Sequence, residues 1–214
     1  MSSGRRDIHL EHLAAAAVGV CLAWASLCRG AETLVVRGDV VHTMAGPAIT
    51  AGVVVVEGGK IRAVGPAATT PIPPNARELR GAIVTPGLVD AHSVVGLSGY
   101  LNQPQDQDQL DPVEAIQPEL RAIDAYNPQE RLIEWLRGFG VTTIHTGHAP
   151  GALVSGQTMV VKLAGTTADA AVLRPVAMVA ATLGDSARAT GDGAEKKSPG
   201  TRSKAVAMLR AEFV

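Results

Sequence analysis

His92 is the residue whose type and surroundings most clearly suggest chemistry. It closes the run Leu88-Val89-Asp90-Ala91-His92, in which apolar residues lead directly to a carboxylate and then an imidazole. An imidazole nitrogen is a good ligand for zinc and for other divalent metals. Asp90 is better suited to orient the strand or a neighbouring ligand than to bind a metal itself. His92 is therefore the candidate metal ligand, and no residue is assigned a catalytic role.

A small β unit precedes this histidine and spans residues 31–81. Its expected strands cover residues 34–36, 40–41, 53–57 and 60–65. The last two of these strands are joined by Gly58-Gly59, which predicts a tight hairpin because both glycines can take positive φ without a steric penalty. A proline cluster from Pro71 to Pro74 marks the end of the unit.

The residues after His92 predict strands that alternate with helices. One helix should begin with Asn127 as N-cap and Pro128 in its first turn. Its apolar face would consist of Leu132, Trp135, Leu136 and Phe139. Further strands are expected over 141–146, 159–163 and 175–183, although the alanines of the last segment also permit a helix. An exposed loop over 185–200 and a helix over 201–214 should follow. Strand, helix and strand in succession predict parallel α/β units.

Three of these features together resemble the amidohydrolase superfamily. The first is the segment Val84–His92, in which an apolar strand and Pro-Gly lead to Asp-x-His. The second is the small β unit with its Gly-Gly hairpin, and the third is Gly140-Val141-Thr142-Thr143 after an amphipathic helix. The combination covers roughly residues 33–165 and is most similar to the imidazolonepropionase-like branch.

The resemblance implies an α/β fold, a (β/α)8 barrel with a β-sandwich built from both chain ends. In such enzymes one or two divalent metals, often zinc, lie at the C-terminal mouth of the barrel and activate water. The implied reaction is hydrolysis of carbon–nitrogen bonds other than peptide bonds in a small-molecule substrate. For this chain we expect a partial barrel of about four strands, residues 82–214, after the small β-sandwich unit.

The chain departs from the family pattern at the metal site. The family's first strand carries His-x-His, whereas this chain has His92-Ser93-Val94, and valine has no lone pair to offer a metal. The chain has 214 residues and its barrel part begins near residue 82, whereas a complete barrel typically takes about 250. The leading hypothesis is an inactive portion of a metal-dependent hydrolase. The alternative is a non-catalytic relative that binds or assembles.

Other residues that could carry chemistry are weaker candidates. His145 and His148 end the strand expected over 141–146, so either could meet a substrate at the barrel mouth. Some relatives carboxylate a lysine on the fourth barrel strand, but Lys162 is expected on the third and is not assigned that role. His42 belongs to the β unit, and His9 and His12 to the leader, so none of these is a site residue.

Two loops contain suggestive residues without the remainder of a motif. The acidic residues Asp106, Asp108, Asp111 and Glu114 lack the glycine and the terminal glutamate of an EF-hand, so a solvated loop is the better interpretation. The segment Gly147–Gly156 is not followed by Gly-Lys-Ser/Thr, and a phosphate-binding loop is not supported.

Residues 1–30 have the pattern of an export signal. Arg5 and Arg6 precede an uncharged run from Leu13 to Leu27, which is shorter than the roughly 20 residues that span a bilayer. The alternative is a buried or membrane-anchoring helix. Removal of the signal would leave a periplasmic or secreted protein without a stable membrane anchor, and cleavage after Gly30 would remove both cysteines.

Composition restricts the class of protein further. The chain is 46% apolar and 18% charged, which suits globular domains. Its net charge of −1 gives no broad attraction to nucleic acid, and nucleic-acid binding is not expected. Substrate identity and oligomeric state are not fixed by these patterns.

Overall fold

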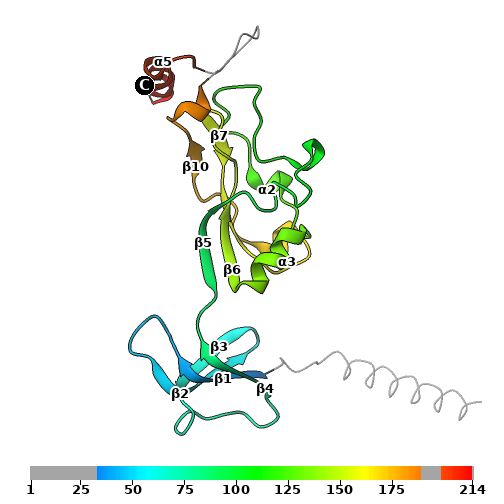
Figure 1. Ribbon diagram of the computed structural model, residues 1–214, viewed down its shortest axis with the longest axis vertical. Coiled ribbons are helices and arrows are strands. Elements are labelled where there is room, and N and C mark those ends of the chain that lie inside the picture. Colours follow the sequence, from blue (N-terminus) through cyan, green and yellow to red (C-terminus); the bar gives the residue numbers. More distant parts are fainter. Residues whose placement is uncertain (1–32, 189–198, 214) are drawn as a thin grey trace, which may run out of the picture. The chain divides into compact units, whose positions relative to one another are not determined.

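The described residues fold into two units, with the division between Pro86 and Gly87. They are shown in Figure 1, a computed structural model that describes residues 33–188 and 199–213. The expected signal peptide, with Cys21 and Cys28, lies outside the described residues. None of the described helices is both long and apolar enough to cross a membrane.

A four-stranded sheet in the order β3-β2-β1-β4 makes up the first unit. Its strands are β1 (Thr33–Val41), β2 (Ile49–Glu57), β3 (Lys60–Pro66) and β4 (Arg77–Val84). The pairs β1/β2 and β2/β3 are antiparallel, and β1/β4 is parallel. Val35, Val53 and Val55 form its core and are at most 2% exposed. Burial of these β-branched side chains on one face explains why the segment pairs as a sheet.

The Gly-Gly hairpin is confirmed. Gly58 and Gly59, with φ of 57° and 75°, connect β2 to β3. The interruption expected at Gly38-Asp39 is wrong, because β1 runs without a break and pairs on both sides through Gly38. The segment 82–84, expected to lead into the barrel, instead completes β4 in the first unit.

An ion pair joins β1 to β4 on the surface of this sheet. The Arg37 guanidinium donates to both carboxylate oxygens of Glu78, from Nε at 2.9 Å and from Nη2 at 3.0 Å. In the parallel register Glu78 pairs with Val35, two residues before Arg37. The hydrogen bonds from Arg37 lower the pKa of the Glu78 carboxyl below its ordinary range.

The second unit contains an open four-stranded sheet in the order β5-β6-β8-β9. Its strands are β5 (Leu88–Ser93), β6 (Val141–Thr146), β8 (Met159–Lys162) and β9 (Val172–Arg174). The β5/β6 pair is parallel, as expected, but β6/β8 and β8/β9 are antiparallel. The prediction of parallel strands throughout is therefore wrong. Between β6 and β8 the chain makes only loops and the strand β7 (Val154–Gln157), without the helical crossover that returns a chain to a parallel strand.

Shorter elements surround this sheet. The strand β10 (Val179–Ala181) pairs antiparallel with β7 in a separate two-stranded sheet. The remaining elements are η1 (Pro104–Asp106), α2 (Ala122–Ala125), α3 (Arg131–Gly138), α4 (Ala168–Ala171), η2 (Asp185–Ala187) and α5 (Arg202–Glu212). The expected helix over 201–214 is thus confirmed for 202–212, and only the three residues 179–181 of the strand expected over 175–183 form β10.

The helix expected from Asn127 begins three residues later than its sequence suggests. Glu130 is the N-cap of α3, and its side chain accepts a hydrogen bond from the Leu132 amide at 3.3 Å. The face of α3 that packs on the core carries Ile133, which is 5% exposed, and Leu136.

The expected apolar face of this helix is therefore partly wrong. Trp135 and Phe139 are 60% and 66% exposed, and their rings lie 4.7 Å apart on the surface.

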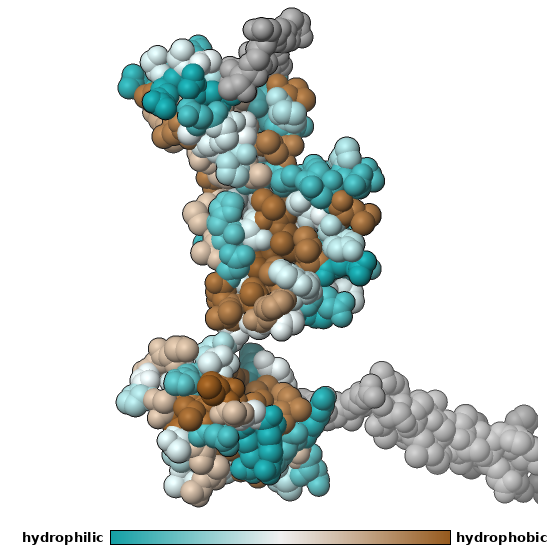
Figure 2. Space-filling view, in the orientation of Figure 1, coloured by the Kyte–Doolittle hydropathy of each residue, from teal (hydrophilic) through white to brown (hydrophobic). Residues whose placement is uncertain are grey.

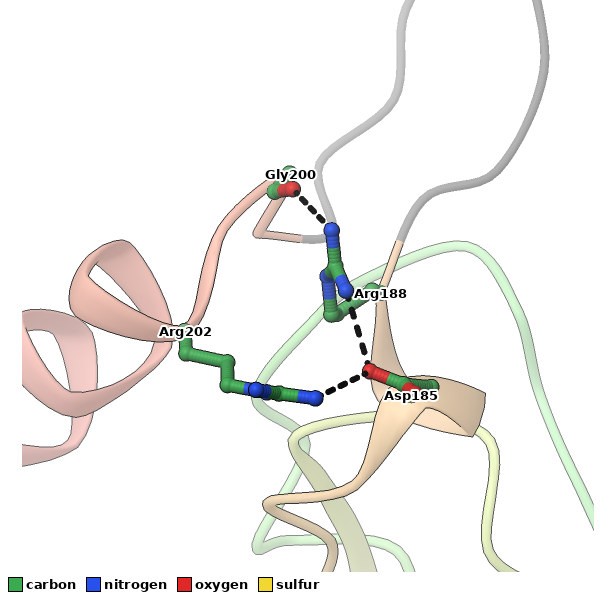
Figure 3. Close-up of polar contacts among 4 residues, drawn as sticks. All are labelled: Asp185, Arg188, Gly200 and Arg202. Carbon is green, nitrogen blue, oxygen red and sulfur yellow. Dashed lines mark hydrogen bonds and ion pairs between the residues drawn. The ribbon is translucent and has the colours of Figure 1, made fainter.

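Polar contacts connect α5 to the segment around η2. The Asp185 carboxylate accepts from Arg188 at 3.0 Å and from Arg202 at 3.4 Å, and Arg188 also donates to the Gly200 carbonyl (Figure 3). These hydrogen bonds lower the pKa of Asp185. Beneath them Ala205 of α5 is buried with Leu153 and Ala115 in a small core.

Candidate functional site

The sequence assigns chemistry to the end of β5, and in the structure this strand end is exposed to solvent. His92 is exposed, and its main-chain amide donates to Asp90 Oδ1 at 3.1 Å. Asp90 therefore contacts the main chain at the end of its own strand. On the other side of the strand Ser93 Oγ accepts from the Val95 amide at 3.0 Å. Val94, where the family pattern has its second histidine, brings no metal-binding atom.

His145 is the imidazole nearest to His92 along the neighbouring strand. The strands β5 and β6 are parallel, and each histidine lies near the carboxyl end of its strand. Both histidines are therefore at the same edge of the sheet. The two ring centroids are 6.3 Å apart and the rings meet edge to face at 79°. The parallel strand pair thus brings His92 and His145 together.

Both nitrogens of His145 are occupied by hydrogen bonds. Nδ1 lies 2.8 Å from the Ala91 carbonyl oxygen, and Nε2 lies 2.6 Å from Thr158 Oγ1. A carbonyl only accepts, so Nδ1 must carry the proton. In the neutral ring Nε2 then has only a lone pair, so the Thr158 hydroxyl donates to it. His145 would have to break this pairing to bind a metal.

The described residues do not fit a zinc site at this strand end. A protein zinc site usually takes three or four side-chain ligands. Within residues 33–188 and 199–213 no group of three or more His, Cys, Asp or Glu side chains is placed to hold a metal. Among the histidines that the structure describes at this strand end, His92 is the one whose ring nitrogens make no hydrogen bond. It could supply one ligand and no more.

The other sequence candidates lie away from this strand end or are explained by their contacts. Lys162 on β8 donates from Nζ to Thr143 Oγ1 at 3.2 Å. In the acidic loop, Asp106 accepts from the Leu101 amide and Asp111 from the Val113 amide. Both carboxylates thus order their own loop.

His148 is a site residue whose character the sequence did not reveal. It is only 5% exposed, and among the described residues its ring nitrogens make no hydrogen bond of good geometry, although the Gln109 and Leu120 carbonyls lie beside the ring. Burial lowers the pKa of this histidine, and the nearby carbonyls of Gln109 and Leu120 oppose that effect only in part. No local pattern signals such burial, because it depends on the packing of the long loop before α2.

Comparison with known proteins gives a likeness in fold. No family model matches the chain, and no curated protein does. An amidohydrolase from Thermotoga maritima MSB8 is similar to 84% of this chain with a TM-score of 0.70 and 23% identity. The chain spans 46% of the length of that protein.

Two further structures match over smaller parts with TM-scores of 0.30. An ochratoxinase from A. niger is 20% identical, over 33% of this chain and 17% of its own. An adenosine deaminase from Xanthomonas campestris with bound zinc is 25% identical, over 56% of this chain and 29% of its own. The structural likeness thus rests on the Thermotoga protein, and the described part of this chain has an amidohydrolase-like fold.

Proposed function

We propose that this chain is part of an amidohydrolase-type hydrolase that acts on carbon–nitrogen bonds other than peptide bonds. The observation that carries the proposal is the parallel pair β5/β6, which brings His92 and His145 to one end of the sheet. The fold likeness to the Thermotoga amidohydrolase supports it. The substrate would be a small molecule, and an imidazolonepropionase-like specificity is part of the proposal.

Activity would require ligands from beyond the described residues of this chain. A divalent metal in such a hydrolase activates water and polarises the scissile carbonyl. Of the described residues, His92 would contribute one ligand, and Asp90 would keep the end of β5 in place through its bond to the His92 amide. His145 would position the strand end, since it is bonded to the Ala91 carbonyl directly before His92.

A second function is favoured by the same strand end. Val94 provides no atom that can bind a metal, and both ring nitrogens of His145 are hydrogen-bonded within the protein. A non-catalytic relative that keeps the fold for binding or assembly would have these features. In that case His92 would be a solvated surface residue.

We further propose that residues 1–30 direct export of the chain to the periplasm or the medium. The support is the sequence pattern of two arginines ahead of an uncharged run. Expression of the full chain with mass analysis of the exported product would test this, and a product that retains Met1 would contradict it.

Zinc titration of the full chain, with metal analysis after dialysis, distinguishes the two functions. The hydrolase proposal expects weak binding that is lost in His92→Ala and kept in the matched control His42→Ala. It also expects Val94→His to raise zinc affinity at least tenfold, because two histidines on one face of a strand end can share a metal. Equal zinc binding by the original chain, His92→Ala and Val94→His would contradict the hydrolase proposal and favour the binding module.

A further inference from the structure

The four-stranded sheet of the first unit has an apolar face that lies outside the core. All four strands contribute apolar side chains to it, and none of these side chains belongs to a core cluster among the described residues. They are Leu34, Val36, Val54, Val56, Ile61, Val64 and Leu79. We refer to this set as the outer face of the sheet. Figure 2 shows apolar side chains on the surface of this unit.

The register of the strands brings these side chains together. Val36 of β1 pairs with Val54 of β2 and with Leu79 of β4, and Val54 pairs in turn with Val64 of β3. Residues that pair directly present their side chains on the same side of a sheet. A second row, two residues along, consists of Leu34, Val56 and Ile61. The outer face is therefore continuous across the whole sheet.

The opposite face of the same sheet is covered by the chain itself. The segment between β3 and β4 packs on the core valines through Ala67, Ile72 and Ala76, and these valines are at most 2% exposed. On the outer face Ile61 and Leu79 remain 67% and 43% exposed. One face of the sheet is thus buried within the unit, whereas the other meets solvent.

The sequence of the inner strands is that of a sheet buried on both faces. The runs Leu34–Val36 of β1 and Val53–Val56 of β2 contain no polar residue. A strand with one face in water usually alternates apolar and polar residues, whereas a strand covered on both faces has a continuous apolar run. A contiguous apolar patch on a sheet of this size also marks a surface that binds another protein.

Charge and size indicate what covers the outer face. At the two edges of the sheet Arg62 pairs with Glu57 at 3.2 Å and Arg80 with Glu78 at 3.7 Å. Because these charges are paired, they give little attraction to a charged partner and little repulsion between two identical faces. Four strands about 4.8 Å apart, with about seven residues each at about 3.3 Å, make a face of roughly 400 Å². Two such faces approach the total of about 1,000 Å² at which specific interfaces begin, which predicts a weak and reversible contact.

We propose that the outer face binds the outer face of a second copy of this chain. Two sheets then pack face to face in a two-fold symmetric dimer, in which each copy uses the same patch. An uncharged sheet face is a good complement to another one, since aligned sheets interdigitate their side chains about 10 Å apart. This contact lies in the first unit and does not depend on hydrolase activity at the end of β5.

Sedimentation equilibrium of the full chain over a range of concentrations tests the proposal. The mean mass should rise reversibly from that of one chain to that of two. Leu79→Lys should raise the dissociation constant about tenfold or more, because the dimer would bury an unpaired ammonium that the single chain leaves in water. The matched control is Val89→Lys on β5, a residue that is 67% exposed in the second unit, and it should leave the constant unchanged.

Methyl-labelled NMR of the unaltered chain gives a second readout that needs no folded variant. The methyl resonances of Val36 and Val54 should shift with concentration in step with the mass, and those of Val161 in the second unit should stay in place. The mass of a single chain at every concentration would overturn the proposal. If the two methyl groups were then also shielded from a soluble paramagnetic probe, the outer face would be covered within one chain. A dimer without these shifts, or one that both lysine variants weaken equally, would place the contact elsewhere and contradict the proposal.

Discussion

The strands β1 and β5 have similar apolar sequences but very different surroundings. β1 lies inside its sheet between β2 and β4, and Val35 is completely buried. β5 lies at the edge of its sheet, and Leu88 and Val89 are 59% and 67% exposed. Figure 2 shows apolar side chains on the surface of the unit that contains β5. β1 is paired on both sides and has Val35 in a core, whereas β5 is paired on one side only and leaves Leu88, Val89 and His92 exposed.

The largest expected effect is the loss of stability when the core of β1 is truncated. Val35→Ala should lower the free energy of unfolding by about 2 kcal/mol, because two buried methyl groups are lost and a cavity remains. Val89→Ala on β5 should change it by less than about 0.5 kcal/mol. Urea denaturation followed by circular dichroism measures both. Equal losses of unfolding free energy in the two variants would show that Val89 is buried in solution. The difference in burial between β1 and β5 would then be wrong.

A smaller effect is expected at the start of α3, where the Glu130 side chain bonds both the first turn of the helix and the loop at Tyr100. Glu130 Oε1 accepts from the Leu132 amide and, at 2.9 Å, from the Tyr100 amide. Glu130→Ala should cost about 1 kcal/mol, as for the loss of other helix caps. Glu130→Gln keeps an acceptor oxygen and should recover most of this loss. If both variants are equally destabilised, the carboxylate charge rather than the cap matters.

The smallest expected effect is a difference in acid sensitivity between the two units. The lowered pKa of His148 means that the unfolded chain takes up its proton near the ordinary value of 6.5, before the folded chain does. The second unit should thus become less stable as the pH falls below about 6.5. The backbone carbonyls of Gln109 and Leu120 favour the protonated ring and keep this effect small.

The first unit should respond at lower pH. The Glu78 carboxyl has a pKa below its ordinary 4.5, so its stabilising contact with Arg37 is present above that value and is lost as the pH falls further. Hydrogen exchange of β1 and β6 amides between pH 7 and 5 compares the units directly. A loss of protection in β1 at least as large as in β6 would contradict the assignment of this acid sensitivity to His148. The substitution His148→Gln should remove the loss of protection in β6.

Much of the local structure could be predicted from sequence because it depends on neighbouring residues. The turn at Gly58-Gly59 follows from the conformational freedom of glycine, and the strand at Val141–Thr146 from its β-branched residues. The start of α3 was misplaced because Asn127 and Glu130 both offer a capping oxygen. The structure selects Glu130, and the Asn127 side chain instead accepts from the Gln129 amide at 2.9 Å.

What could not be predicted depends on contacts between distant residues. The antiparallel return of β8 follows from the β7 segment, which has no strong local signal. His145 and His148 looked equivalent along the chain, yet His145 is hydrogen-bonded at both nitrogens, whereas the buried ring of His148 makes no hydrogen bond of good geometry with any residue that the structure describes. Only the fold determines which atoms surround each ring.

The surface pair Trp135 and Phe139 has a practical consequence for spectroscopy. An indole already 60% exposed in the native state should emit at long wavelength, close to the emission of a denatured chain. Its fluorescence would therefore change little when the sheet beneath α3 melts. It should respond instead to a quencher such as iodide, or to any molecule that covers this side of the helix, and so reports docking rather than unfolding.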